Sequence, residues 1–600
     1  MDESHPAGAS RLGVDTGGPF TDVVASDGRA VKLLSTPDDP ARAVAEGITL
    51  AGGAAVLTHG TTVATNALLE RRGGRVALVT TEGHADVIEI ARQVRPSLYD
   101  VWADRPAPLV PRDLRFELPG RLAASGREVT SLGQVEVPDG TDAIDAIAIC
   151  LLHADLNPDH ERAIGAVFRQ SGMDATLSCE VSPEFREFER TVTTVANAYL
   201  RRPCRGYLLG LRRLAREVYV VTSAGGLIPL EDAAERPVAL LLSGPAGGVL
   251  AASAAAVAAG YPDAVTFDMG GTSTDVCLIR DGRPEPASQR VVAGFPIRMP
   301  SLDVHTIGAG GGSVARLDPG GALIVGPESA GADPGPVCYG RGGERPTVTD
   351  ADLVAGRIRA DEGLPGLGRL DATAAVMALK SSSLTAEGVI AVVDANMVRA
   401  VRRVSVERGV DPRGLALVAF GGAGPLHACA LADALGMAAV VVPPRAGVLS
   451  AAGIMAAPRQ VELVRSWPMP ADHAGASRAV GELGARAVSR LGDGALVETF
   501  MDCRYAGQSH ELTVARVSDF ESEHHRRNGF IRAGSPIEVV ALRAVSRVES
   551  PVWLSDLPRP GNRRGPVKGP SVISEADCSV WVPAGWSAAV DQGGAWILTR

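Results

Sequence analysis

Two short segments of this sequence combine an aspartate with paired glycines in the same order. Residues 15–22 read DTGGPFTD and residues 268–275 read DMGGTSTD, so five of the eight positions agree. Glycines allow a positive φ and let backbone N–H groups approach phosphate oxygens, while a carboxylate can hold magnesium-bound water. The repeat therefore predicts two hairpins that grip a triphosphate from both sides, although a single copy could be no more than a tight turn.

The two aspartates of the repeat are the candidate catalytic and metal-binding residues. We expect Asp15 and Asp268 to organise Mg²⁺ and its bound water. Phosphate contacts are expected from the glycines and hydroxyls that follow: Gly17, Gly18, Thr21, Gly270, Gly271, Thr272 and Ser273.

A third glycine cluster, FGGAGP at 420–425, follows the apolar run LALVA and precedes a predicted helix. Small residues there would let the backbone approach a nucleotide, so Gly421, Gly422 and Ala423 are expected to lie against the adenosine of ATP. Close packing of helix on strand is the alternative interpretation.

Other phosphate-binding motifs do not fit. The only lysines are Lys32, Lys380 and Lys568, and none of them stands in a P-loop pattern. The GAGGGS run at 308–313 lacks the downstream acidic residue of a dinucleotide-binding unit, so it is a weak signal.

The elements around these motifs alternate between strand-like and helix-like patterns. Apolar runs at 11–15, 22–26, 54–58 and 75–80 are separated by helical stretches, which is typical of an α/β fold. Together with the repeat, they predict a duplicated two-lobe fold of the actin-like ATPase type (ASKHA, ribonuclease H-like). Further expectations are a buried helix at 246–260, a long helix at 183–201, a helix at 481–491 and a strand at 536–548. The predicted domains are 1–200, 201–457 and an additional α+β C-terminal region, 458–600.

Composition excludes several classes of protein. The chain has 600 residues, a net charge of −10 and no broad basic face, so nucleic acid is not an expected partner. No apolar run is long enough for a membrane span and the start MDESHPAGAS has no leader pattern, so we expect a cytoplasmic protein without membrane contact. The eight cysteines form no CxxC pair, which argues against disulfides or a thiolate zinc site.

Many longer motifs resemble one family, the hydantoinase A/oxoprolinase family. The likeness covers nearly the whole chain, and its motifs follow one another in the family's order: RLGVDTGGPFTD (11–22), THGTTVATNALLERRG (58–73), SPEFREFERTVTTVANAYL (182–200), TSAGGL (222–227), LLSGPAGGV (241–249), FDMGGTSTDVCLI (267–279), DVHTIGAGGGSVA (303–315), PESAGADPGPVCYGRGG (327–343), PTVTDADLVAGR (346–357), FGGAGPLHA (420–428) and RYAGQSHEL (504–512).

The resemblance implies an ATP- and Mg²⁺-dependent enzyme that phosphorylates an unreactive carbonyl. We expect the ATP-binding subunit of a cyclic-amide hydrolase acting on a hydantoin or oxoproline, in a hetero-oligomer with a separate hydantoinase B-like chain. The nucleotide-binding subunit of an acetone-type ketone carboxylase, or a degenerate scaffold subunit, are the alternatives. His305 is a further candidate catalytic residue, oriented by Asp303, and His59 and Asp303 are candidate substrate contacts. The alternative for each histidine is an ordinary hydrogen-bonded loop residue.

One position departs from the family pattern. Members carry Thr after the paired glycines, as here at Thr272, but the first copy has Pro19, which has neither a hydroxyl nor an N–H. Losing a charge-assisted hydrogen bond costs about 1.5 to 3 kcal/mol, or about one to two powers of ten in affinity or rate. We therefore expect weakened use of ATP.

Overall fold

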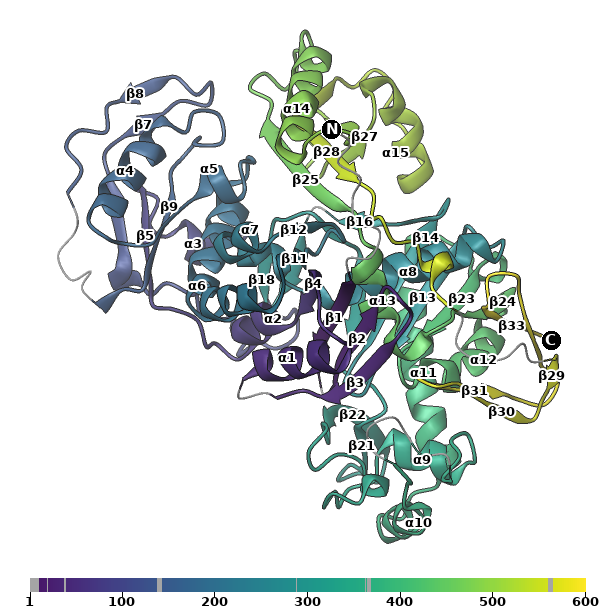
Figure 1. The fold of residues 1–600 in the computed structure, drawn as a ribbon. Coiled ribbons are helices and arrows are strands. Elements are labelled where there is room, and N and C mark those ends of the chain that lie inside the picture. The colour runs from purple at the N-terminus through teal and green to yellow at the C-terminus, as the bar shows by residue number, and fades with distance from the viewer. Residues whose placement is uncertain are drawn as a thin grey trace, which may run out of the picture.

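Two large mixed sheets form the centre of the molecule, and smaller units surround them (Figure 1). The computed structural model describes residues 10–18, 20–36, 39–136, 143–287, 289–361, 363, 368–558 and 565–600. Pro19 lies outside the described residues. The predicted α/β class is confirmed.

The first sheet has ten strands, in the order β27-β26-β28-β25-β12-β11-β4-β1-β2-β3. The C-terminal region thus extends the sheet that the N-terminal strands begin. The strands are β1 Arg11–Gly17, β2 Phe20–Ala25, β3 Ala30–Leu34, β4 Val56–Thr61, β11 Glu217–Val221, β12 Leu227–Pro229, β25 Arg459–Ser466, β26 Leu496–Tyr505, β27 Leu512–Val514 and β28 Ile537–Val548.

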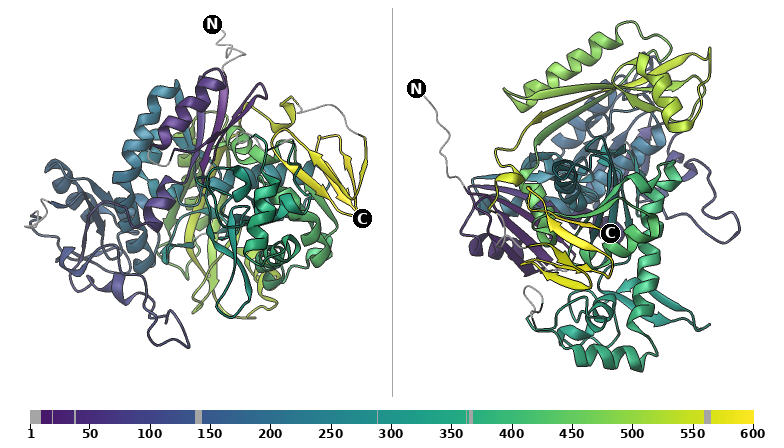
Figure 2. Two further views of the ribbon diagram at one scale, coloured as in Figure 1. Left: turned by 90° about the horizontal axis from the view of Figure 1, so that it is seen from below. Right: turned by 90° about the vertical axis from the view of Figure 1, so that its right-hand side faces the viewer.

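The second sheet has nine strands. Its main path is β15-β14-β13-β23-β24-β33-β32-β29, and β20 also pairs with β14. Figure 2 shows the last strands of the chain, in yellow, beside the green part of this half. The strands are β13 Ala264–Met269, β14 Thr274–Arg280, β15 Arg283–Pro284, β20 Val304–Ile307, β23 Ala416–Phe420, β24 Ala439–Val442, β29 Val567–Lys568, β32 Ser587–Val590 and β33 Trp596–Thr599.

Both sheets contain the same five-strand unit. In the first, the order is β3-β2-β1-β4-β11; β1, β2 and β3 are antiparallel neighbours, and β4 and β11 run parallel to β1. In the second, β15-β14-β13-β23-β24 repeats this order and these directions. Each copy places one aspartate motif at its first hairpin, so the sequence repeat is also a repeat of topology.

Two helices made of small residues connect the halves. Helix α8 (Gly244–Ala258) packs on the second sheet, α13 (Leu449–Ala456) packs on the first, and the two helices contact each other. A Cβ placed on Gly453 would lie 1.9 Å from the carbonyl oxygen of Gly247, and one on Gly13 would lie 2.1 Å from that of Ala451. Only glycine permits so close a crossing, which explains the small-residue run predicted as a buried helix.

Replacing Gly453 by Ala is expected to lower the free energy of unfolding by about 1 to 3 kcal/mol, because the added methyl group must push the helices apart. Urea unfolding followed by circular dichroism measures this loss. The matched control is Gly481→Ala on the exposed face of helix α14 (Ala476–Leu491), where a Cβ meets nothing within 4 Å. That control should gain about 0.5 to 1 kcal/mol from helix propensity, and equal effects of both changes would contradict the close crossing.

A smaller α/β unit interrupts the first half of the chain, on the left of Figure 1. Its four strands are all parallel, in the order β10-β9-β5-β6, and the inner strand β9 (AIAIC) is apolar and buried throughout, as is typical of a parallel sheet. Helix α6 then leads back to the large sheets and runs past Pro203, further than the predicted 183–201. The elements are β5 Val76–Thr81, β6 Arg115–Leu118, β9 Ala146–Cys150, β10 Ala175–Leu177, α4 Asp159–Gln170, α5 Ser178–Val181 and α6 Glu187–Leu211.

The C-terminal strands of the first sheet carry their own helices and core, at the top of Figure 1. Helix α14 (Ala476–Leu491) covers β25, β26 and β28, and α15 (Phe520–Asn528) follows β27. Apolar residues of these elements form a separate buried cluster around Tyr505 and Phe520. The predicted helix at 481–491 and strand at 536–548 are confirmed.

In the described part of the chain no single helix is long and apolar enough to cross a membrane, and the one helix pair that passes by length and composition, Ala372–Ser381 with Ala386–Arg408, is bent by 83°. All eight cysteines are free and seven of them are buried.

The remaining elements are short or peripheral. The other helices are α1 Pro40–Leu50, α2 Val63–Leu69, α3 Val87–Ile90, α7 Leu230–Glu235, α9 Val348–Val354, α10 Ala372–Ser381, α11 Ala386–Val404 and α12 Gly424–Leu435. The two-stranded ribbons pair β7 Arg121–Leu122 with β8 Glu128–Thr130, β16 Pro286–Ala287 with β19 Ser301–Leu302, β17 Arg290–Val292 with β18 Phe295–Ile297, β21 Ser313–Leu317 with β22 Leu323–Ser329, and β30 Ser571–Ser574 with β31 Ser579–Val582.

Candidate functional site

The two aspartate motifs form equivalent hairpins. Asp15 on β1 stands directly opposite Asp22 on β2, and Asp268 on β13 stands directly opposite Asp275 on β14. Directly opposed residues of an antiparallel pair project from the same face of a sheet. Each hairpin therefore presents two carboxylates on one face, and we call these four side chains the carboxylate cluster.

The two hairpins meet. A Cβ placed on Gly18 would lie 3.4 Å from Thr272 Oγ1, so the tip of one hairpin touches the tip of the other. Burial raises the pKa of Asp15 to about 7, with further contributions from the carboxylates of Asp22 and Asp275. Burial also raises the pKa of Asp268 well above its ordinary value, and Asp275 and Asp15 add to this effect. The structure thus brings together Asp15 and Asp268 as the sequence predicted.

Only two of the four carboxylates have partners in the described structure. Lys32 Nζ donates to Asp22 Oδ1 at 2.7 Å, and Thr306 Oγ1 donates to Asp275 Oδ1 at 2.5 Å. Among the described residues Asp15 Oδ1 is buried without any hydrogen-bond partner. A buried acceptor without a donor is costly unless a cation or a ligand satisfies it.

These residues fit a magnesium ion that keeps most of its water. In the described part of the chain no group of three or more acidic, histidine or cysteine side chains surrounds a single metal position. Mg²⁺ retains several waters and needs only one or two carboxylates together with phosphate oxygens. Asp15 and Asp268 offer that number, on carboxylates whose raised pKa values a cation would lower again.

The glycine-rich run at 308–313 braces the second hairpin. Gly311 donates its N–H to the carbonyl of Gly270 at 3.0 Å, and Gly312 donates to that of Gly271 at 2.7 Å. The run therefore fixes the backbone of the hairpin tip, and this contact is the structural reason for its glycines.

The third glycine cluster lies against the second hairpin. Gly421 has φ +80°, and a Cβ on it would lie 2.4 Å from Asp268 Oδ1. The N–H of Ala423 donates to the carbonyl of Met269 at 3.0 Å, while a Cβ on Gly422 would meet nothing within 4 Å. The turn before α12 thus adjoins the carboxylate cluster and leaves open space at Gly422.

His59 lies on the opposite face of its sheet from the carboxylate cluster. Asp15 pairs in register with Gly60, so the preceding residue, His59, projects from the other face. Its side chain is fully buried, its Nε2 lies 2.7 Å from the hydroxyl of Tyr207, and burial lowers its pKa to about 4. His59 is placed as an internal hydrogen-bonded residue, not in the group that the sequence predicted.

His305 is separated from the cluster in the same way. Thr306 is the register partner of Asp275, so His305 projects from the other face of β20. There burial lowers its pKa, and Arg403 and Arg408 lower it further. The carboxylate of Asp303 forms an ion pair with Arg408. The structure thus does not bring His305 together with Asp268.

Thr21 also differs from its predicted position. It is fully buried, and its hydroxyl lies 3.2 Å from that of Ser35. It stands opposite Thr16 in the strand register, next to Asp22, and therefore projects from the face away from the carboxylates. The hairpin-tip residues Gly17, Gly18, Gly270, Gly271, Thr272 and Ser273 remain the predicted phosphate contacts.

Sequence reasoning missed three members of the site: Asp22, Asp275 and Lys32. The signal was present, because both copies of the motif end in aspartate. Lys32 is one of three lysines in the chain, and it reaches Asp22 because β3 pairs with β2 at the register Asp22 to Lys32.

Behind the third glycine cluster, α12 carries a buried ionic contact. His427 is fully buried, with Nδ1 2.7 Å from Asp394 Oδ1 and Nε2 3.2 Å from Asp352 Oδ2. Burial alone would lower the pKa of His427, but the two carboxylates outweigh it and raise the pKa to about 10. A charged histidine therefore ties α12 to α9 and α11.

This contact predicts a pH-dependent stability. Because the folded pKa of His427 exceeds its ordinary value, the proton it holds stabilises the fold fully below about pH 6.5 and progressively less as the pH rises toward 10. The slope is at most about 1.4 kcal/mol per pH unit. Urea unfolding at several pH values should show this loss in the natural chain and not in His427→Gln. The exposed His525→Gln should behave like the natural chain, and an unchanged slope in His427→Gln would contradict the assignment.

Comparisons with known proteins match one family over most of the chain. The family model described as "Hydantoinase/oxoprolinase N-terminal region" matches residues 11–172, and the model "Hydantoinase/oxoprolinase" matches residues 190–462. The chain is 33% identical to caprolactamase subunit alpha of Pseudomonas jessenii, covering 98% of this chain and 99% of that one. It is 34% identical to 5-oxoprolinase of Saccharomyces cerevisiae over 75% of this chain and 41% of that protein. The crystal structure of the ATP-dependent caprolactamase from Pseudomonas jessenii superposes with a TM-score of 0.83 at 31% identity, over 98% of this chain and 99% of that chain.

Proposed function

The chain belongs to the hydantoinase/oxoprolinase family, and on that premise we propose that it binds ATP and phosphorylates a cyclic amide so that the ring can be hydrolysed. The observation that carries this proposal is the meeting of two equivalent hairpins, each with two opposed carboxylates beside paired glycines. An amide carbonyl is a poor electrophile. Transfer of the terminal phosphoryl group of ATP to this oxygen gives ADP and an imidate phosphate. Water adds to the imidate carbon, the ring C–N bond breaks to leave a ring-opened acyl phosphate, and a second water releases phosphate and the amino acid.

The residues of the site have distinct proposed roles. Asp15 and Asp268 would hold Mg²⁺ through its water, and the ion would neutralise charge on the phosphates. Glycine N–H groups at both hairpin tips and the hydroxyls of Thr272 and Ser273 would position the phosphate oxygens. Such fixed donors and charges supply most of the catalysis in phosphoryl transfer.

The paired five-strand units support a finer assignment of fold. We propose that the two halves are the lobes of an actin-like ATPase, with Gly421, Gly422 and Ala423 beside the adenosine. The open space at Gly422 and the contact of Gly421 with Asp268 support this placement of the nucleotide.

The same premise leads to a proposed partner. The related caprolactamase chain is named as subunit alpha, and this chain matches only 41% of the related oxoprolinase. We propose that a separate hydantoinase B-like chain supplies the hydrolytic step in a hetero-oligomer.

The test is substrate-dependent release of phosphate. The chain, alone and co-expressed with a hydantoinase B-like chain from the same genome, is incubated with ATP, Mg²⁺ and caprolactam, 5-oxoproline or hydantoin, and both phosphate and ring-opened acid are measured. Equal amounts of the two products from one cyclic amide would support the proposal. Phosphate release driven only by acetone or acetophenone with bicarbonate would replace it with a carboxylase, and absence of ATP binding by calorimetry would overturn it.

Pro19 provides a further prediction. Restoring a hydroxyl and an N–H with Pro19→Thr is expected to raise ATP affinity or the rate of phosphate release about 10- to 100-fold. The converse change in the second hairpin, Thr272→Pro, should lower the same quantity. A Pro19→Thr variant that binds ATP no better than the natural chain would show that the first hairpin does not contact phosphate through this position.

A further inference from the structure

A cavity of about 420 Å³ lies where three parts of the chain meet. It is lined by residues of the small α/β unit, by the start of α6, and by the C-terminal strands of the first sheet. The cavity is remote from the carboxylate cluster. Helix α6 begins at the cavity with Glu187, whereas Tyr207 near its other end touches His59, and these two helix positions are about 30 Å apart at about 1.5 Å per residue.

The lining carries hydrogen-bond donors that the protein does not use. Ser466 is only 3% exposed, and its buried hydroxyl has no partner among the described residues. Arg186 Nε is likewise buried and unpartnered, although Arg186 Nη2 donates to Glu511 Oε2 at 2.7 Å. No side chain caps the first turn of α6, which begins in the same lining. Two unsatisfied donors and a helix start without a side-chain cap, all in one lining, indicate a ligand that accepts hydrogen bonds.

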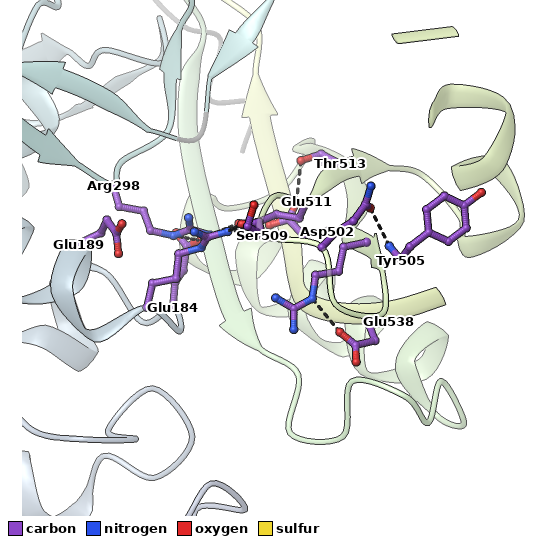
Figure 3. Close-up of polar contacts among 12 residues, drawn as sticks. Glu184, Glu189, Arg298, Asp502, Tyr505, Ser509, Glu511, Thr513 and Glu538 are labelled. Carbon is purple, nitrogen blue, oxygen red and sulfur yellow. Dashed lines mark hydrogen bonds and ion pairs between the residues drawn. The ribbon is translucent and has the colours of Figure 1, made fainter. Parts of the chain in front are cut away.

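Two further arginines line the cavity, and both are partly satisfied. Arg92 donates bidentate hydrogen bonds to the carboxylate of Glu189, and Arg504 Nε donates to Glu538 Oε2 at 2.7 Å. Figure 3 shows the neighbouring polar contacts, with Glu184 and Arg298 at the left and Ser509 and Glu511 to their right. Arg298 forms ion pairs with both Glu184 and Glu511. These contacts hold the walls of the cavity in place before any ligand arrives.

Part of the wall is apolar. Phe185, Trp467, Pro470 and Val540 all line the cavity. The guanidinium of Arg186 lies 5.2 Å from the centre of the Phe185 ring. A phosphate ion would make no use of this surface, whereas a hydrocarbon chain would be removed from water against it. The carboxylates of Asp155 and Glu187, also in the lining, oppose a multiply charged anion.

The backbone at the cavity is unusual in two places. His153 has φ +61° and Arg186 has φ +80°, and both side chains line the cavity. Non-glycine residues in this region are costly and gather at sites where a ligand is held. Both residues are thus fixed in conformations that their neighbours must support.

We propose that this cavity binds a small monocarboxylic acid with an apolar chain, at a site separate from the carboxylate cluster. The carboxylate accepts from Arg186, Ser466 and the start of α6, and the chain lies between Phe185 and Trp467. Because its walls come from three parts of the chain, an occupied cavity holds the small α/β unit and the C-terminal strands together.

Hexanoate is the probe. Calorimetric titration of the full chain with hexanoate should show saturable binding, and the fluorescence of Trp467 should change with it, so that Trp467→Phe removes the optical signal. Arg186→Ala should weaken binding at least about 10-fold, and Ser466→Ala several-fold. Ser466→Ala removes one unpaired oxygen only, so its fold should be retained, which circular dichroism checks.

Matched controls separate this site from others. Arg478→Ala, on the 85% exposed side chain in the same region, and Asp268→Asn, in the carboxylate cluster, should both leave hexanoate binding unchanged. Inorganic phosphate and hexylamine should not compete. The proposal is overturned if hexanoate gives no saturable heat, if hexylamine or phosphate binds equally well, or if Arg186→Ala and Ser466→Ala bind as tightly as the natural chain.

Discussion

Asp268→Asn is expected to lower the rate of ATP-dependent phosphate release by about 10²- to 10³-fold, the usual cost of removing one positioned charge from a catalytic site. Asp268 and Asp15 are the two carboxylates of the cluster without a partner among the described residues. The amide is nearly the same shape but cannot hold the charge of a cation. A coupled phosphate-release assay at saturating ATP and Mg²⁺ measures the change.

The same variant is expected to be more stable than the natural chain in the absence of nucleotide and Mg²⁺. The pKa of Asp268 is raised in the fold, so ionising it costs stability, and this loss grows as the pH rises above the ordinary value of about 3.9. Removing the charge removes the loss. A site that gains stability as it loses activity is one whose arrangement serves function.

The exposed loop residue Asp493 provides the matched control for this prediction. Asp493→Asn should change neither phosphate release nor the free energy of unfolding. If Asp268→Asn were destabilising at neutral pH, or kept full activity, the carboxylate cluster would be a structural feature only.

Arg543→Ala is expected to lower the free energy of unfolding by about 3 to 5 kcal/mol, because it leaves the buried carboxylate of Asp502 without a countercharge and removes one of the two arginines that pair with Glu184. Arg543 on β28 donates to Glu184 Oε2 at 2.7 Å and to Asp502 Oδ2 at 2.8 Å. All three side chains are at most 6% exposed. Glu184 precedes α6, so the contact joins the start of that helix to the C-terminal strands. Urea unfolding with more than one probe measures the loss.

Arg547 provides a control on the same strand. Its side chain is 38% exposed and pairs with Glu498 at 2.7 Å, so Arg547→Ala should cost less than about 1 kcal/mol. If the two variants lost equal stability, the burial of the Arg543 contacts would have no energetic consequence.

Part of this structure could be predicted from local sequence patterns. The hairpin at Asp15 and its repeat at Asp268 were found because glycine pairs and flanking apolar runs are local signals. The helix at 481–491 is likewise a short-range feature of the sequence. The ten-stranded sheet could not be predicted in this way, because β12 and β25 pair across more than two hundred residues of chain.

In the candidate site, the sequence did not show from which face of the sheet each side chain projects. His59 and Asp15 belong to neighbouring strands, and a shift of one residue in register would place both on the same face. Local patterns do not fix that register, so the polar loop around His59 was interpreted as part of the site. The same ambiguity applies to His305 and Asp275, whose pairing depends on the register of β20 with β14.

The last strands of the chain have a consequence for solubility. β33 pairs with β24, the final strand of the repeated unit in the second sheet. A chain lacking residues 565–600 would keep the unit but leave the N–H and C=O groups of β24, in the apolar stretch Ala439–Val442, open along one side. Such an edge is a template for pairing with another molecule, so the truncated chain would be prone to aggregate even with both hairpins intact.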